Sequence, residues 1–352
     1  MSQLATHASP TAVLDRLALV STVRGAPSLA ERLADLDRWV KTDLQNFEAE
    51  LDGLSDSAKG ARMVHHAAHH LLDLRGKHLR PLCVALASRF GDGFTPRARS
   101  LAVAVELVHS ATLLHDDVVD LAERRRGQPT ASVVYGNAAS IFAGDWLLIS
   151  ALRRIRASGV DGVLDRMLSV IDEMIVAESV QLERRGKISG AREDYFAIIE
   201  GKTAALFRWA MIAGARSADL PAASEAALER FGFHLGVAFQ AVDDELDYKD
   251  NTGKDPLADL REGKVTFPLV VAIERDPSLR ARLEELLAHE TVAADQLAPI
   301  AQAVRASGAL QATRSLAEEH VQRALDALDV LPAGGARDAL VTVALASLER
   351  QS

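Results

Sequence analysis

The sequence contains little cysteine and no long uninterrupted run of apolar residues. Its single cysteine, Cys83, cannot form a disulfide within the chain and offers no metal-ligand spacing, which fits a reducing compartment. No stretch approaches the roughly 18 apolar residues of a membrane span, and the first residues show neither the basic segment nor the apolar run of a signal peptide. We therefore expect a cytoplasmic protein without a stable membrane span.

Aromatic residues and alternating apolar and polar runs are also scarce. Aromatics make up 5% of the chain, and Ala, Leu, Glu and Arg dominate segments whose apolar positions recur three and four residues apart. This pattern argues against a strand-rich fold and predicts an all-α protein. The net charge of −9 argues against a non-specific hold on nucleic acid, so an anionic ligand would need a local cluster of cations.

Turn residues divide the chain into about a dozen helical segments. Four of them are apolar over more than half of their circumference and are therefore expected inside one large bundle, namely 97–121, 131–156, 164–185 and 224–247. Residues 1–27 have weaker periodicity and two prolines. We predict that they form a loosely structured N-terminal extension, followed by a single domain over residues 28–352.

Two acidic clusters stand at the ends of apolar segments. They are Asp116, Asp117 and Asp120 in "LLHDDVVDLAERRRG", and Asp243, Asp244 and Asp247 in "FQAVDDELDY". On a helix the first and third carboxylates of each cluster share a face, where like charges repel. Clustered carboxylates suit Mg²⁺, which binds one or two of them and leaves places for water and phosphate oxygens. One such cluster can be solvated surface, but two with the same spacing predict a shared group of metal ions.

Basic residues near turns would supply contacts for a phosphate or diphosphate. They are Lys77 and Arg80 in "RGKHLRP", Arg124 to Arg126 before Gly127, and Lys202 in "EGKTAALF". A single lysine at a helix end is commonly a cap. Three adjacent arginines beside carboxylates are harder to explain without an anion. The chain has no GxxxxGK[ST] motif, which excludes a Gly-rich phosphate loop of that type.

With these motifs in order between about Leu72 and Pro268, the chain resembles the trans-isoprenyl diphosphate synthases, the polyprenyl synthetase family. "GKHLRP" (76–81) is similar to the family's GKRxRP, although His78 stands where the family usually has Arg. "ELVHSATLLHDDVVD" with "RRG" is similar to the first aspartate-rich region. "GKT" (201–203) and "FQAVDDELDY" with "GKDPLADLREGKVTFP" are similar to the later regions.

The resemblance implies an all-α bundle of the isoprenoid synthase type around a central cavity, usually as a homodimer. It implies a prenyltransferase of isoprenoid biosynthesis, which condenses isopentenyl diphosphate with an allylic diphosphate by ionisation, condensation and elimination. The six aspartates would face the cavity, bind Mg²⁺, typically three ions, and through it hold the allylic diphosphate.

The resemblance also implies roles for individual residues. Arg125, Lys202, Lys254 and Lys264 would contact the allylic diphosphate; Lys77, Arg80, His109 and Arg126 would hold isopentenyl diphosphate; Thr203 and Gln240 would lie beside the reacting carbons. His109 is seven residues before Asp116 and so shares its helix face, which agrees with this role. His115 lies about 100° away from that face and is expected either to be structural or to support the metal-binding residues from behind.

Product length depends in this family on the residues four and five positions before the first aspartate, where a bulky side chain stops growth early. Here these residues are Ala111 and Thr112, which are both small. We therefore predict a product longer than C20, with Met167, Ile171 or Met174 as possible floors of the tunnel. A short-chain farnesyl or geranylgeranyl diphosphate synthase is the alternative.

Other classes of protein explain fewer of the motifs. His65, His66, His69, His70 and the pair His115-Asp116 would fit an HD-type metal phosphohydrolase, but that function leaves the second acidic cluster and "GKT" without a role. A non-catalytic prenyl synthase subunit usually loses one cluster, whereas this chain keeps both. A class I terpene cyclase has no need of "GKHLRP" and "RRG", and its cavity uses aromatic residues, which are scarce here.

Overall fold

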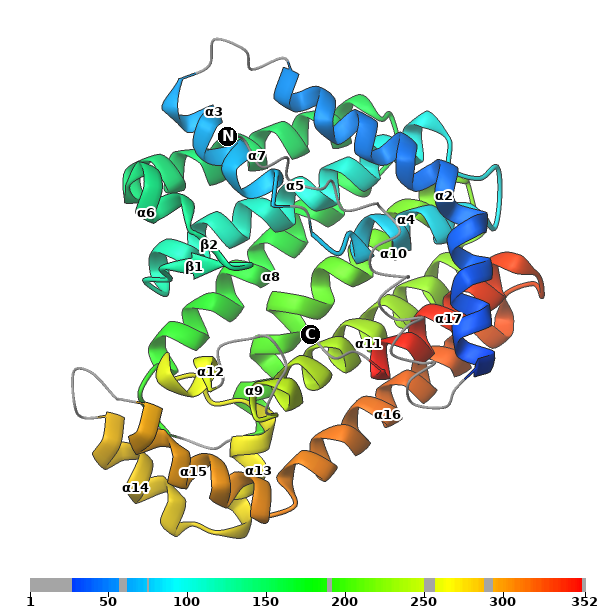
Figure 1. The fold of residues 1–352 in the computed structure, drawn as a ribbon. Helices are drawn as coiled ribbons and strands as arrows, with labels where there is room; N and C mark the ends of the chain where they lie inside the picture. Colours follow the sequence, from blue (N-terminus) through cyan, green and yellow to red (C-terminus); the bar gives the residue numbers. More distant parts are fainter. Residues whose placement is uncertain are drawn as a thin grey trace. The chain divides into compact units, whose positions relative to one another are not determined.

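The computed structural model describes residues 27–56, 62–74, 76–188, 192–249, 257–287 and 294–349. Helices form nearly all of the regular structure in these ranges (Figure 1), which confirms the predicted all-α class. The elements are α2 (Pro27–Asp56), α3 (Met63–Leu72), α4 (Leu79–Ser88), α5 (Pro96–Val119), β1 (Arg124–Arg125), β2 (Gln128–Pro129), α6 (Ala131–Tyr135), α7 (Asn137–Ala157), α8 (Val163–Arg184), α9 (Arg192–Ile199), the π-helix η1 (Glu200–Ala204), α10 (Ala205–Ser217), α11 (Ala222–Asp247), α12 (Ala258–Arg261), α13 (Phe267–Arg275), α14 (Ser278–Leu287), α15 (Ala294–Ala306), α16 (Ala309–Ala327), the 3-10 helix η2 (Leu328–Val330) and α17 (Gly335–Leu348).

Two predictions fall outside the described residues. Lys254 is one of them, and the expected N-terminal extension is the other, apart from Pro27, with which α2 begins. Both stay predictions.

The chain forms two compact units. The first comprises Met1–Asp165, Ala210–Ala226 and Pro332–Thr342, and the second comprises Arg166–Trp209, Ala227–Leu331 and Val343–Ser352. Four helices, α8, α10, α11 and α17, begin in one unit and end in the other. A division of this kind does not decide how many domains the chain has, so the single domain over 28–352 stays a prediction.

Helix α5 is the centre of the first unit. It packs against α2, α3, α4, α6 and α7. Its N-terminus is capped because the Thr95 side chain accepts a hydrogen bond from the Ala98 amide at 3.4 Å, and Pro96 occupies the first turn. Every residue from Leu101 to Val108 is buried, as expected for a helix that is apolar on all sides. The residues at the end of α5 are thus carried on a well-supported element.

The helix expected over 131–156 is interrupted. Gly136 has φ +87°, a backbone conformation that only glycine adopts readily, and it separates the short α6 from α7. The sequence pattern did not show this break because the apolar spacing continues across it.

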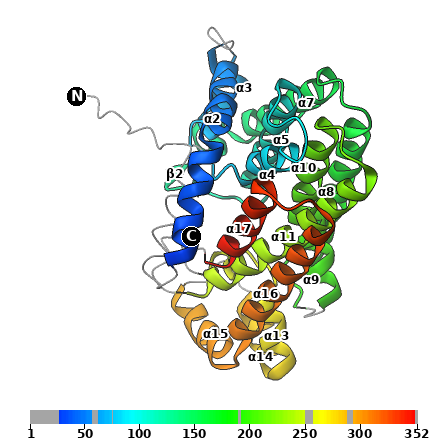
Figure 2. The ribbon, with the colours of Figure 1, turned by 90° about the vertical axis from the view of Figure 1, so that its right-hand side faces the viewer.

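In the second unit, α13 is the central element. It packs against α9, α14, α15 and α16, and Figures 1 and 2 both show α13 to α16 side by side. Their core includes Tyr195, Phe267, Leu269, Leu297 and Ile300. The end of α11, which carries the second acidic cluster, belongs to this unit.

The expectation that residues 131–156 and 164–185 lie wholly inside a bundle is wrong for one face of each. On α7, Phe142 and Ile149 are exposed, and on α8 the same holds for Leu168, Ile175 and Leu182. Residues seven apart share a helix face, so each helix presents an apolar stripe to solvent in the isolated chain. Apolar composition predicted burial correctly only for the faces that pack within this chain.

None of the helices in the described ranges combines the length and the hydropathy that crossing a membrane requires.

Candidate active site

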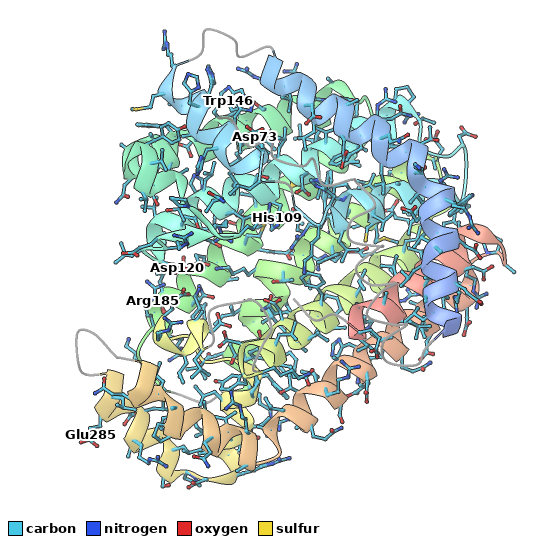
Figure 3. All side chains as sticks on the ribbon, viewed as in Figure 1. Asp73, His109, Asp120, Trp146, Arg185 and Glu285 are labelled. Atoms are coloured by element: carbon cyan, nitrogen blue, oxygen red, sulfur yellow. The ribbon has the colours of Figure 1, made fainter. Side chains whose placement is uncertain are left out.

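The first acidic cluster lies at the C-terminal end of α5. Asp116 and Asp117 are in its last turn and Asp120 is its C-cap residue, as Figure 3 shows for Asp120. The C-terminus of a helix carries the negative end of its dipole, so carboxylates there are unfavourable unless cations compensate them. Asp117 is only 2% exposed. An arrangement this costly is typical of a site that binds cations.

The arginine run forms a β-hairpin that was not predicted from the sequence. Strands β1 and β2 pair in antiparallel fashion, and Arg126 and Gly127 form the turn with φ of +51° and +78°. Positive φ at both central residues defines a two-residue type I′ turn. The turn separates the three arginines, and Arg125 points to the acidic cluster, where its Nε donates a hydrogen bond of 2.8 Å to Oδ1 of Asp117.

The charge state of Asp117 reflects this contact. Burial raises the pKa of Asp117 above its ordinary value, and the guanidinium of Arg125 only partly opposes the effect of burial. A second cation beside Asp117 would therefore favour the ionised carboxylate further.

The histidine next to the cluster is structural, as expected. Nε2 of His115 lies 3.2 Å from the carbonyl oxygen of Ile141 on α7 and 3.4 Å from a carboxylate oxygen of Asp145. A Cβ on Gly144 would come within 2.3 Å of the same ring nitrogen, so the ring packs directly on α7. His115 thus anchors α5 to α7.

The predicted isopentenyl diphosphate residues lie in the same unit. Lys77 and Arg80 flank the start of α4, His109 is on α5 (Figure 3), and Arg126 is in the hairpin turn. Burial, with the nearby Arg80 guanidinium, lowers the pKa of His109 to about 3. His109 is therefore a neutral hydrogen-bonding group at physiological pH.

The two product-length candidates are small groups on α5. Ala111 is 1% exposed, and the hydroxyl of Thr112 donates to the carbonyl oxygen of His109 at 2.8 Å. On α8, Met167 is buried, and Ile171 and Met174 are half-buried. No bulky side chain occupies the positions that the family rule concerns.

The second acidic cluster lies at the C-terminal end of α11, where neutral donors surround Asp244. The hydroxyl of Tyr195 donates to its Oδ2 at 2.8 Å, and Nε2 of Gln240 donates to its Oδ1 at 2.8 Å. Oε1 of Gln240 in turn accepts a hydrogen bond of 2.9 Å from Thr203. The structure thus joins three predicted residues, Thr203, Gln240 and Asp244, in one chain of hydrogen bonds.

The pKa of Asp244 is raised to about 8. The first cause is burial and the second is the carboxylate of Asp259, while the hydrogen bonds from Gln240 and Tyr195 act in the opposite direction. A divalent cation at this carboxylate would reverse the shift because it favours the ionised form.

The third aspartate of this cluster has a different partner. Oδ1 of Asp247 accepts a hydrogen bond of 3.0 Å from the amide of Ala258, the first residue of α12. Asp247 therefore holds the start of α12.

Lys202 and Thr203 lie in η1, the π-helical turn between α9 and α10. Gly201 is needed there because a Cβ would come within 2.7 Å of the Ala177 side chain and 2.8 Å of the Glu173 carbonyl oxygen on α8. The ammonium group of Lys202 pairs with Glu178, which is also on α8. Short π-helical turns inside α-helices occur frequently at functional sites.

A cavity of about 150 Å³ lies within the second unit, beside Asp244 and Lys202. Its lining includes five predicted residues, Lys202, Thr203, Gln240, Asp244 and Lys264. It also includes residues that were not predicted as site residues, among them Arg184, Lys187 and Tyr195. Tyr195 is seven residues before Lys202, and this spacing, about two helical turns, was the signal in the sequence that could have placed Tyr195 beside the site.

Metal binding was tested on the donor groups themselves. Within the described residues, no three or more histidine, cysteine or acidic side chains form a group that could hold a metal ion. Mg²⁺ needs only one or two protein carboxylates beside water and phosphate oxygens. Buried carboxylates with raised pKa values, Asp117 and Asp244, fit this mode of binding. They do not fit a site made by protein ligands alone.

Three of the α3 histidines contact neighbouring elements. The rings of His65 and His69 contact Trp146 at centroid distances of 4.8 and 6.2 Å, and Nε2 of His70 lies 2.8 Å from the carbonyl oxygen of Pro129. These contacts dock α3 onto its neighbours.

Comparisons with known proteins agree with this site. The polyprenyl synthetase family model matches residues 61–304. The octaprenyl diphosphate synthase of Escherichia coli K12 is 34% identical over 293 residues, covering 82% of this chain and 90% of that protein. A polyprenyl synthase from Caulobacter crescentus CB15, solved with calcium and isoprenyl diphosphate, is 34% identical with a TM-score of 0.84, covering 90% of this chain and 97% of that one.

A geranylgeranyl pyrophosphate synthetase from Pyrococcus horikoshii Ot3 is also similar, at 27% identity and a TM-score of 0.82 over 90% of this chain and 99% of that one. The match covers most of the chain and includes both aspartate clusters, the GKT segment and the arginine hairpin. The chain belongs to the polyprenyl synthetase family.

Proposed function

We propose that this chain is a divalent-metal-dependent prenyltransferase that condenses isopentenyl diphosphate with an allylic diphosphate to give a longer trans-polyprenyl diphosphate. One observation carries the proposal. Both acidic clusters are complete, and each includes a buried aspartate that is hydrogen-bonded to predicted site residues, Arg125 in one and Gln240 in the other. Family membership gives the reaction class, and these contacts support the roles proposed for particular side chains.

The six aspartates are the residues that would hold Mg²⁺, and we propose three ions. When bound, the metal supplies positive charge that stabilises the departing diphosphate. The chain adds its own cations to this task. Arg125, Lys202, Lys264 and Lys254 are proposed to bind diphosphate oxygens, and a preorganised arginine stabilises negative charge where it develops.

Isopentenyl diphosphate is proposed to bind to Lys77, Arg80, His109 and Arg126. His109 contributes as a neutral group because its pKa is near 3, so it donates a hydrogen bond and adds no repulsion to the cations around it. The positive charge of this subsite then comes from one lysine and two arginines.

The bond changes follow from these positions. The allylic C–O bond breaks, and both electrons leave with the diphosphate. The alkene of isopentenyl diphosphate forms the new C–C bond with the allylic cation, and one proton is then lost to restore an allylic double bond. Hydroxyl and amide oxygens next to a developing cation are stabilising, which suits Thr203 and Gln240. The released diphosphate is the proposed base.

The product is proposed to be longer than C20. The support is Ala111 and Thr112 on α5, together with the likeness to an octaprenyl diphosphate synthase. The alternative is a short-chain product, which the likeness to a geranylgeranyl pyrophosphate synthetase keeps open. The variant Ala111→Phe should shorten the product, and an unchanged product length would contradict the role given to this residue.

A homodimer is proposed on the exposed apolar stripes. Seven-residue spacing of Leu168, Ile175 and Leu182 on α8 is typical of helix pairing, and Phe142 and Ile149 on α7 repeat it. Light scattering of the purified protein should give twice the chain mass of 37.8 kDa. A cytoplasmic location also stays a prediction.

The function is tested directly by product sizing. The purified protein is incubated with Mg²⁺, labelled isopentenyl diphosphate and each of the C5 to C20 allylic diphosphates in turn. We expect elongation with at least one primer and products beyond C20. No elongation with any primer would contradict the proposal, and phosphate release without isopentenyl diphosphate would favour a phosphohydrolase. A non-catalytic subunit would become active only with a second chain.

A further inference from the structure

Glu106 is a buried carboxylate on α5 that begins the "ELVHSATLLHDDVVD" region but was given no role of its own there. Its Oε1 lies 3.1 Å from Nδ1 of His78, and the two side chains are 6% and 9% exposed. His78 is the N-cap residue of α4 and has φ +46°, an uncommon backbone conformation for a residue with a side chain. The ring of Phe47 holds the imidazole from the other side, edge to face at 5.1 Å.

Glu106 also faces the hairpin turn. A Cβ on Gly76 would lie 3.0 Å from Oε1 of Glu106 and 3.2 Å from Nη2 of Arg126. The backbone at residue 76 therefore passes close to both groups, immediately before Lys77. A side chain at residue 76 would press on both groups, so glycine suits this close approach.

The charge of Glu106 is maintained by its neighbours. Burial alone would favour the neutral acid, but His78, His109 and Arg80 together lower the pKa of Glu106 to about 2. The carboxylate is thus ionised at any physiological pH. Its partners come from three elements, which are the 76–81 segment, α5 and the hairpin.

We propose that Glu106 is a positioning residue of the isopentenyl diphosphate subsite, where its carboxylate holds the surrounding cationic groups in place through His78 and Arg126. The proposal rests on the proposed function, which assigns Lys77, Arg80, His109 and Arg126 to that ligand. Cations gathered without an anion repel one another and would spread apart, whereas one fixed carboxylate among them keeps their geometry before the diphosphate arrives.

The same arrangement explains the histidine at position 78. An imidazole at this position reaches the carboxylate over a short distance and packs on Phe47. His78 is therefore the partner of Glu106, and the diphosphate contacts are left to Lys77 and Arg80.

The test is the kinetics of Glu106→Gln, which keeps the shape of the side chain and removes its charge. We expect KM for isopentenyl diphosphate to rise by about tenfold to a hundredfold, the range typical when a residue that orients ligating groups is lost. KM for the allylic diphosphate should change by less than about twofold, because Glu106 does not serve the aspartate clusters.

The matched control is Glu50→Gln. Glu50 also pairs with two arginines of the first unit, Arg99 at 2.7 Å and Arg154, but none of these residues belongs to the proposed site. Its loss should lower the melting temperature and leave both KM values unchanged. His78→Gln should reproduce the KM effect of Glu106→Gln. His78→Arg should keep KM near the wild-type value, because its guanidinium can donate to the carboxylate in place of the imidazole.

Three outcomes would overturn the inference. The first is an equal rise in both KM values of Glu106→Gln, and the second is an unchanged KM for isopentenyl diphosphate in that variant. The third is a KM for isopentenyl diphosphate that is no lower in His78→Arg than in His78→Gln. If Glu106→Gln does not fold, Glu106→Asp replaces it, and the shorter carboxylate should still raise KM selectively. If the wild-type protein itself shows no condensation, the proposed function fails. If the wild type condenses normally and the Glu106 variant is unaffected, only the role of Glu106 fails.

Discussion

The two aspartate clusters have the same sequence spacing but opposite kinds of neighbours. In the first unit, Asp117 is hydrogen-bonded to the charged guanidinium of Arg125. In the second unit, Asp244 is hydrogen-bonded to neutral donors, Tyr195 and Gln240, and a further carboxylate, Asp259, acts on it. Burial raises the pKa of both, but among the hydrogen bonds of the described residues a protein cation reaches only Asp117. A repeated motif therefore does not imply a repeated electrostatic environment.

The largest expected effect is common to both clusters. Asp117→Asn and Asp244→Asn should each lower turnover by about 10²- to 10³-fold, because each removes a carboxylate proposed to hold the Mg²⁺ that stabilises the leaving diphosphate. Turnover is measured with saturating substrates and Mg²⁺. A defect in only one of the two variants would show that the clusters are not functionally equivalent.

Removal of the Arg125 guanidinium should affect the first aspartate cluster alone. Arg125→Gln should raise KM for the allylic diphosphate and lower the free energy of unfolding by about 1.5 to 3 kcal/mol, the usual worth of a hydrogen bond to a charged group. Denaturant unfolding gives the second quantity. Equal stability of the variant and the wild type would mean that Arg125 serves the ligand and not the fold.

The pH dependence of stability should distinguish the clusters in metal-free protein. The pKa of Asp244 is near 8 in the folded protein and near 3.9 in the unfolded chain, so between these values the folded protein holds the extra proton. The contribution of Asp244 to stability should therefore decrease as pH rises from about 4 to about 8. The difference between wild type and Asp244→Asn, measured with a chelator present, isolates this contribution, and a difference that is flat with pH would contradict the raised pKa.

The smallest effect is expected for the neutral donor. Tyr195→Phe removes one hydrogen bond to Asp244 and should cost about 1 kcal/mol of unfolding free energy. The tyrosine hydroxyl favours the ionised carboxylate, so its loss should move the pH window of Asp244 upward. Thermal melts across pH check both points. Tyr248→Phe serves as the comparison, because it removes the hydroxyl of another buried tyrosine of the same core, which lies beside the side chain of Thr266.

The sequence predicted those parts of the site that lie in regular helices. The i, i+1, i+4 spacing of the aspartates and the seven-residue spacing of His109 and Asp116 were sufficient to place these side chains together. Helical geometry fixes which side chains share a face. The chain of Thr203, Gln240 and Asp244 was identified as separate residues, but their hydrogen bonds depend on how η1 packs beside α11, which no local pattern shows.

The hairpin was missed for a physical reason. Two strands of two residues each have no periodicity, and their stability comes from the Arg126-Gly127 turn and from Asp117. The role of Glu106 was missed because this residue lies within an apolar run, where a single acidic residue does not by itself indicate a site. Buried ion pairs such as Glu106 and His78 join residues that are distant in sequence, so they become visible only in the fold.

The π-helical turn at Glu200–Ala204 has a consequence for how this chain can change. A π-turn is equivalent to an α-helix that holds one additional residue in a single turn, so every side chain beyond it is rotated by about 100° relative to an unbroken helix. Deleting one residue there would restore a regular helix and leave the side chains of α10 on their present faces, because the loss of one residue cancels that rotation. A one-residue deletion in this turn should thus keep the packing of α10 and displace the turn residues themselves, among them Lys202 and Thr203.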